Sequence, residues 1–296
     1  MKLRVEHRTT YQYEGVVSVG QSVAKLRPRA TLGQEVWESQ LVIEPAPSSQ
    51  ATYRDYFGNH ADYFLLDTAH ESLEVTATSE VKVAPARRLD PASSPPWEDA
   101  RAQLRSAATV GTDGALEHVF PSPYIKPNDE LRAYAKESFL PGRPVLEAAF
   151  ELCHRIFTDF EYQSGSTTIA TPLTEVFEKR KGVCQDFAHL GIACLRSLGL
   201  AARYVSGYLV TEPPPGQPKL QGADASHAWL AVFSPGAGFV DLDPTNNKMP
   251  DESYITTAWG RDFGDVSPIK GVVLGGGAHT VHAAVDVTRL DDGNLN

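Results

Sequence analysis

The most informative part of the sequence is the stretch Arg180-Lys-Gly-Val-Cys-Gln-Asp-Phe-Ala188, because it places a cysteine at the start of an expected helix. From Cys184 onward, apolar and small residues recur at steps of three and four, which is the spacing of one helix face. These residues are Phe187, Leu190, Gly191, Cys194 and Leu198. Gly199 is a suitable C-terminal stop. The free N–H groups and the positive dipole end of a helix N-terminus stabilise a thiolate, so the sequence predicts a nucleophilic cysteine at position 184.

Two strand-like segments, joined by a glycine-containing hairpin loop, supply the histidine and the carboxylate that such a thiol needs. If Phe233 pairs with Phe239, then Asp243 lies opposite Trp229 and diagonal to His227 on the same face of the sheet. Diagonal neighbours are about 7–8 Å apart at the backbone, within reach of a carboxylate and an imidazole. The spacing therefore predicts that His227 and Asp243 meet.

Each of these residues also has a structural interpretation when it is taken alone. A single cysteine on an apolar stripe usually packs as a small core residue, and Asp-Pro-Thr commonly opens a turn. Cys153 and Cys194 lie in apolar runs, and we expect both to be core residues. The combination of thiol, imidazole and carboxylate favours covalent acyl-transfer chemistry for Cys184.

Three motifs together resemble the transglutaminase-like core of bacterial cysteine hydrolases. They are Gly-Val-Cys-Gln-Asp-Phe-Ala-His-Leu (182–190), Ser-His-Ala-Trp (226–229) and Asp-Pro-Thr-Asn (243–246). The resemblance implies that Cys184 is the nucleophile, that His227 is the base and that Asp243 orients the imidazole. It also suggests oxyanion or substrate-lining positions at Tyr162, Gln185 and Trp229. The chain departs from the family at Phe239, where tryptophan is common, so we expect a different local pocket shape.

The N-terminal third is similar to the β-rich domain that accompanies these bacterial cores. Apolar residues alternate from Leu3 to Tyr13, and Asp55-Tyr-Phe-Gly-Asn59 is a turn signal, a pattern typical of a β-sandwich. The fold class we predict is α+β, with a β-sandwich at residues 1–84, a proline-rich linker at 85–100 and a papain/transglutaminase-like core at 101–296. In that core a central helix should pack against an antiparallel sheet.

Composition and charge narrow the function classes. The formal net charge of −10 argues against nucleic acid or an anionic membrane as the main partner. The start of the chain lacks a signal-peptide pattern, and no apolar run approaches membrane-spanning length. The chain has three cysteines, an odd number without the spacing of a disulfide framework, and this fits a reducing compartment. We therefore expect a cytoplasmic protein that acts on a peptide or protein substrate and needs no metal or cofactor.

The expected reaction is attack of the Cys184 thiolate on a peptide or carboxamide carbonyl, with the Cys184 backbone N–H as oxyanion donor. Hydrolysis is the favoured outcome because water needs no second pocket, and transfer to an amine stays open. A metallohydrolase using His279 and His282 is the first alternative, although their spacing differs from the helical zinc signature. The second alternative is a non-catalytic binding module, which thiol reactivity would distinguish from an enzyme.

Overall fold

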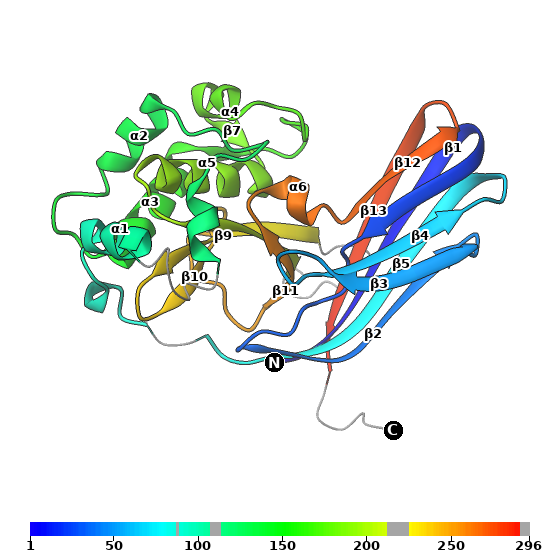
Figure 1. The fold of residues 1–296 in the computed structure, drawn as a ribbon, viewed down its shortest axis with the longest axis horizontal. Helices are drawn as coiled ribbons and strands as arrows, with labels where there is room; N and C mark the ends of the chain where they lie inside the picture. Colours follow the sequence, from blue (N-terminus) through cyan, green and yellow to red (C-terminus); the bar gives the residue numbers. More distant parts are fainter. Residues whose placement is uncertain (87–88, 107–113, 212–224, 291–296) are drawn as a thin grey trace, which may run out of the picture.

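The computed structural model describes residues 1–86, 89–106, 114–211 and 225–290 (Figure 1). A large curled antiparallel sheet stands beside a core of helices packed on a smaller sheet (Figure 1). This arrangement confirms the predicted α+β class. Among the described residues, no helix is long and apolar enough to cross a bilayer.

The large sheet is built around β1 (Lys2–Ala24), which has neighbours on both of its edges. Its order is β2-β5-β1-β4-β3, and β12 and β13 also pair with β1. The other strands are β2 (Gln34–Glu44), β3 (Ser49–Arg54), β4 (His60–Leu66), β5 (His70–Val83), β12 (Ile269–Gly275) and β13 (His279–Arg289).

The partners of β1 change halfway along its length. Leu3 pairs with Val81 of β5 and with Arg289 of β13, whereas Ala24 pairs with Asp62 of β4 and with Ile269 of β12. The register shifts between Gln12 and Val17, and irregularities of this kind bend a sheet. The strands expected to form a sandwich therefore form one curled sheet, which encloses a cluster of buried apolar residues from β1, β2, β4 and β5.

The C-terminal strands correct the expected domain boundary. We expected residues 101–296 to belong to the core, but β12 and β13 return to the sheet of the N-terminal domain. Their pairing with β1 joins residues more than 240 positions apart, and such a contact leaves no trace in local sequence patterns. The core is therefore an insertion between β5 and β12.

The core sheet has the order β10-β9-β8-β11, and its helices cover one face (Figure 1). Its strands are β8 (Ala202–Leu209), β9 (Ala225–Ser234), β10 (Gly238–Leu242) and β11 (Tyr254–Gly260). The helices are α1 (Trp97–Ser106), α2 (Asp129–Lys136), α3 (Val145–Asp159), α4 (Leu173–Lys179), α5 (Cys184–Ser197) and α6 (Phe263–Val266), with 3-10 turns η1 (Pro91–Ser93) and η3 (Ala115–Val119). A short parallel pair, β6 (Glu161–Tyr162) and β7 (Lys181–Gly182), precedes α5.

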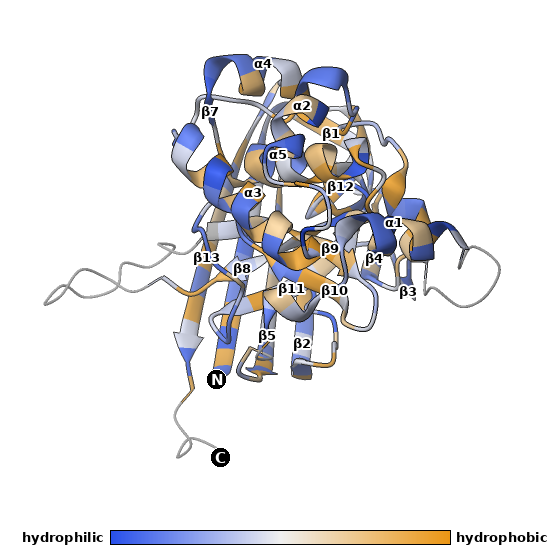
Figure 2. Cartoon of the chain, turned by 90° about the vertical axis from the view of Figure 1, so that its left-hand side faces the viewer, coloured by the Kyte–Doolittle hydropathy of each residue, from blue (hydrophilic) through white to orange (hydrophobic). Residues whose placement is uncertain are grey.

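Helix α5 is the central helix of the core, as predicted. It packs against β9, and hydrophobic residues are concentrated where the helices meet this sheet (Figure 2). Gly191 allows the close approach, because a Cβ at this position would collide with the Leu230 side chain. Gly199 has a φ of +79° and ends the helix region, in agreement with the predicted stop.

The edge strand β11 is held by two side-chain amides from the N-terminal domain. Gln34 donates to the Thr256 carbonyl (2.8 Å) and accepts from its N–H (2.9 Å). Asn59 makes the same two bonds with Trp259, at 2.8 and 2.9 Å. These amides satisfy backbone groups as a neighbouring strand would, and they fix the large sheet against the core.

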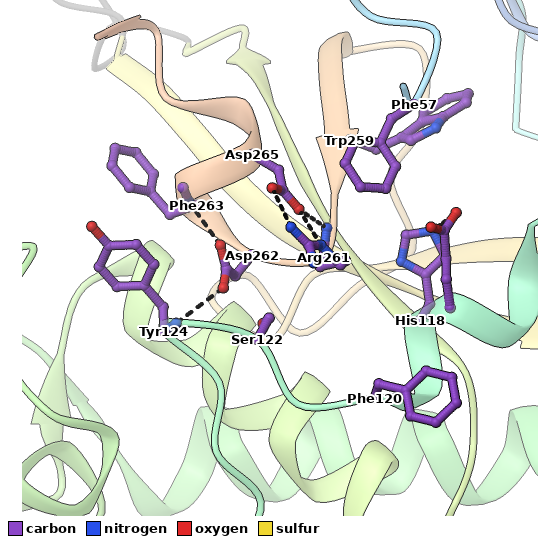
Figure 3. A network of polar contacts seen from close by, with 12 residues as sticks. Phe57, His118, Phe120, Ser122, Tyr124, Trp259, Arg261, Asp262, Phe263 and Asp265 are labelled. Carbon is purple, nitrogen blue, oxygen red and sulfur yellow. Dashed lines mark hydrogen bonds and ion pairs between the residues drawn. The ribbon is translucent and has the colours of Figure 1, made fainter. Parts of the chain in front are cut away.

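The end of β11 is anchored further by acidic side chains around α6 (Figure 3). Asp262 accepts from the backbone N–H of Gly264 (2.9 Å) and of Tyr124 (3.0 Å), and Arg261 forms an ion pair with Asp265 (2.9 Å). Trp259 therefore stands at a rigid strand end.

Candidate active site

The N-terminus of α5 is shaped by Asp186, which folds back toward the start of the helix. Its carboxylate accepts from the Val183 N–H (2.8 Å) and from the Thr167 hydroxyl (2.6 Å). Gly182 leaves the space for this turn, because a Cβ there would lie 2.9 Å from the Asp186 side chain. Cys184 opens the helix, is half-buried and packs against the core cluster, as the apolar stripe predicts.

The hairpin β9–β10 has the predicted register, with Phe233 opposite Phe239. This register brings His227 and Asp243 together, and the His227 Nε2 atom lies 2.7 Å from Oδ2 of Asp243. Gly207 of β8 pairs with His227 and makes room for the Trp229 ring beside it. The expected contact between imidazole and carboxylate is therefore present.

Asp243 is fully buried and accepts hydrogen bonds from several groups. Oδ2 accepts hydrogen bonds from the Tyr254 hydroxyl (2.7 Å) and from the Asn246 side-chain amide (2.7 Å), in addition to its contact with His227. Oδ1 accepts hydrogen bonds from the backbone N–H groups of Thr245 (2.8 Å) and Asn246 (3.2 Å). Burial alone would raise the pKa of Asp243, but the hydrogen bonds and the charge of His227 lower it below its usual value.

His227 connects the carboxylate to the thiol. Cys184 lies close enough to the ring for its sulfur to help raise the pKa of His227. Burial disfavours the imidazolium, yet the hydrogen bonds and charges of Asp243 and Cys184 outweigh burial and raise the pKa of His227 to about 9. The ring is therefore protonated at neutral pH. The site contains an imidazolium between a carboxylate and a sulfur.

The other three residues suggested by the resemblance lie in different surroundings. Tyr162 is 54% exposed on β6 and close enough to Cys184 for the charge of the sulfur to help raise the pKa of the phenol, although burial has the larger effect. Gln185 is half-buried at the second position of α5. Trp229 is fully buried and packs beside the His227 ring, with centroids 6.0 Å apart.

Three residues of the site were not singled out from the sequence. Tyr254 and Asn246 hold the carboxylate, and Asp186 holds the helix start. Asp186 had a local signal, because an acidic residue at the third helical position is the capping-box pattern. Asn246 lies inside the Asp-Pro-Thr-Asn motif. Tyr254 comes from β11 and had no local signal.

The two histidines of the metallohydrolase alternative are both exposed on β13. They are three residues apart on one strand, so their side chains point to opposite faces. His279 pairs with Tyr13, whereas His282 pairs with Thr10. In the part of the chain that the structure describes, no three His, Cys, Asp or Glu side chains are grouped to hold a metal ion.

A Cys–His–Asp cluster at a helix N-terminus, packed on an antiparallel sheet, defines a transglutaminase-like architecture. The chain belongs to the transglutaminase-like superfamily, whose family model matches residues 132–244, and the model of the bacterial transglutaminase-like N-terminal region matches residues 3–82.

Individual relatives agree with this assignment. An uncharacterized protein of Mycobacterium tuberculosis is 42% identical over 305 residues, a match that covers 100% of this chain and 95% of the relative. A protein-glutamine gamma-glutamyltransferase of Pseudomonas aeruginosa is 30% identical over 100 residues, which cover 31% of this chain and 15% of the relative. The crystal structure of a candidate cysteine protease from Cytophaga hutchinsonii has the same fold, with a TM-score of 0.76, 22% identity and coverage of 98% of this chain and 91% of that chain.

Proposed function

We propose that this protein is a cysteine-dependent acyl-transfer enzyme that hydrolyses peptide or carboxamide bonds, with Cys184, His227 and Asp243 as its catalytic triad. The observation that carries the proposal is the position of His227, which contacts Asp243 at 2.7 Å and lies close enough to Cys184 for the sulfur to help raise the pKa of the ring. A buried imidazole with a raised pKa, placed between a thiol and a carboxylate, is the arrangement that activates a cysteine nucleophile.

The proposed first half-reaction forms a thioester. The thiol proton resides on His227, and the Cys184 sulfur attacks the carbonyl carbon of the substrate. The carbonyl oxygen becomes an oxyanion near the Cys184 backbone N–H, which as the first N–H of α5 has no partner within the helix. When the C–N bond breaks, the imidazolium gives its proton to the leaving amine. Asp243 keeps the ring in the orientation that this transfer needs.

The proposed second half-reaction releases the acyl group. His227, now neutral, accepts a proton from water as the water oxygen attacks the thioester, and the C–S bond breaks to restore the Cys184 sulfur. A primary amine can replace water in this step, which would make the protein a protein-glutamine amine transferase. Both outcomes use the same three residues. Water as acceptor is the proposal because it needs no dedicated second pocket.

A test uses the full chain with a quenched-fluorescent peptide library, and with casein plus a fluorescent primary amine. Peptide cleavage that disappears in Cys184→Ala supports the hydrolase. Incorporation of the amine without cleavage would favour the transferase. If neither substrate set reacts and an electrophilic amide probe fails to label Cys184, the binding-module alternative replaces the enzyme. We further propose a cytoplasmic location, which fractionation of the native host would test.

A further inference from the structure

A cavity lies on the face of the core sheet that is turned away from α5. This cavity has a volume of about 870 Å³ and is lined by β8, β9 and β10 on one side and by the N-terminal domain and η3 on the other. Its volume is in the range of small-molecule sites. Neither Cys184 nor His227 nor Asp243 lines it. The cavity is therefore distinct from the proposed triad but borders it, because Tyr254 and Trp229, which contact Asp243 and His227, also line the cavity.

Two opposite charges lie on its floor and attract each other without forming a direct ion pair. Arg203 and Asp241 both pair with Ala231 of the strand between them, so they flank a small residue on one face of the sheet. Among the described residues, neither side chain has an ion-pair partner within 4.0 Å. The Nε atom of Arg203 and the Oδ1 atom of Asp241 are also buried without a hydrogen-bond partner, and the Trp229 indole lies near enough to the Asp241 carboxyl to influence its pKa.

Both side chains are deep in the protein yet remain partly accessible. Since both line the cavity, their accessible parts face it. Burial lowers the pKa of Arg203 to about 10, so its guanidinium is still charged at neutral pH. Burial raises the pKa of the Asp241 carboxyl, and the charge of Arg203 and the indole N–H of Trp229 oppose this effect. Charges left unpaired at such depth are costly, and they are commonly kept for binding.

Aromatic rings hold the arginine in place and form the cavity wall. The Arg203 guanidinium carbon lies 4.2 Å from the ring centre of Phe239 and 3.7 Å from that of Trp259. Figure 3 shows Trp259 beside Phe57, with His118 nearby, and all three residues line the cavity. A planar guanidinium fixed between rings presents its N–H groups in a fork that fits a carboxylate.

We propose that this cavity binds a short peptide with free termini, about the size of a dipeptide, with its carboxylate on Arg203 and its ammonium group on Asp241. The strands that carry the two residues are separated by one strand, which places their backbones about 10 Å apart. The termini of an extended dipeptide are about 7 Å apart, so both can be reached by side chains that lean inward. An apolar side chain of the peptide would lie against Phe57 and Phe233, which also line the cavity. This inference does not rest on the proposed function.

The test measures binding to the full chain after Cys184 has been alkylated with iodoacetamide, so that the candidate active site is blocked. The probe is glycyl-L-phenylalanine. Its binding is measured by titration calorimetry and by the change in tryptophan fluorescence, to which Trp229 and Trp259 of the cavity contribute. N-acetyl-L-phenylalanine amide, which carries neither charge, is the matched control ligand. We expect the neutral ligand to bind about 10- to 100-fold more weakly, the factor that corresponds to a charge-assisted hydrogen bond.

Three variants locate the site. Arg203→Met and Asp241→Asn should each lower the affinity for the dipeptide by about 10-fold or more. Asp251→Asn is the matched control, because Asp251 lines the cavity but is already paired with Lys248 (2.9 Å) and Ser253 (2.9 Å). It should leave binding unchanged. Four results would each overturn the proposal. Arg203→Met could bind the dipeptide as tightly as the wild type, or the neutral ligand could bind as tightly as the dipeptide. Alkylation could abolish binding, or the dipeptide could fail to bind at millimolar concentration.

Thermal unfolding separates binding from structure. Because neither Arg203 nor Asp241 has an ion-pair partner within 4.0 Å, Arg203→Met and Asp241→Asn should lower Tm only slightly or raise it. A large fall in Tm for both would mean that the two charges are structural and would overturn the proposal. If Arg203→Met does not fold, Arg203→Lys takes its place. Lysine keeps the positive charge but lacks the forked N–H groups of the guanidinium, so it should still weaken the binding of the dipeptide.

Discussion

His227 and Asp243 are 16 residues apart in the chain, yet Nε2 of the first lies 2.7 Å from Oδ2 of the second. The contact follows from the register of one hairpin, in which Phe233 pairs with Phe239. A single-residue slip of β10 would turn Asp243 to the opposite face. The proposed catalytic geometry therefore depends on the pairing of β9 with β10.

The carboxylate should be needed at position 243 and not two residues earlier. Asp243→Asn is expected to lower kcat by several orders of magnitude, since the ring then loses its partner and its correct tautomer. Asp241→Asn should change kcat by less than about 3-fold, since Asp241 faces the cavity behind the site. Equal losses in both variants, measured on one substrate, would contradict the proposed roles.

Activity should depend on the protonation of His227. Its folded pKa is raised to about 9, so the imidazolium is present below that pH and is lost above it. We expect kcat/KM to fall as pH rises through about 9. In Asp243→Asn the residual activity should decline at a lower pH, because the carboxylate that helps raise the pKa is gone. A pH–rate profile of both proteins checks this, and an unmoved basic limb would argue against the ion pair.

The Tyr254 hydroxyl should act as a positioning group for Asp243. Tyr254→Phe removes a hydrogen bond to a charged carboxylate and is expected to lower the free energy of unfolding at pH 7 by about 1.5–3 kcal/mol. The pKa of Asp243 is lowered in the folded protein, so its stabilisation is present above the unfolded pKa and is lost as pH falls through the folded value. The variant and the wild type should therefore converge in stability at acidic pH. A difference that stays constant with pH would mean that only ring packing has changed.

Alkylation should distinguish the three cysteines, all of which are free thiols. Burial raises the pKa of Cys153, and it raises that of Cys194 to about 12, so both should be inert in the folded protein. Limited iodoacetamide at neutral pH, followed by peptide mass mapping, should label Cys184 first. The preference should weaken in His227→Ala. Uniform labelling of the native protein would remove the basis for a nucleophilic cysteine.

Gly182 should be required for the start of α5. Gly182→Ala brings a methyl group to 2.9 Å from the Asp186 side chain, which must then give up its bond to the Val183 N–H. We expect a loss of about 1–3 kcal/mol in unfolding free energy and slower alkylation of Cys184. Gly33→Ala is the control, because a Cβ there meets nothing within 4 Å. Equal effects of the two changes would show that Asp186 does not hold the helix start.

The site was more predictable from sequence than the assembly of the fold. Periodicity located α5, and strand alternation predicted the contact of His227 with Asp243, since both depend on residues near each other in the chain. Tyr254 could not be found in this way, because its hydroxyl reaches Asp243 from β11, on the far side of β8 and β9. The pairing of β12 and β13 with β1 was missed for the same reason.

That pairing has a consequence for biosynthesis. During translation β1 leaves the ribosome before the core does, and one of its two edges stays unpaired until β12 and β13 have been made. The last two strands therefore complete the large sheet by pairing the C-terminal end of the chain with β1. Removing them would leave a backbone edge of β1 exposed to other molecules. Shortening the chain before Ile269 should therefore cause aggregation even though every proposed catalytic residue is retained.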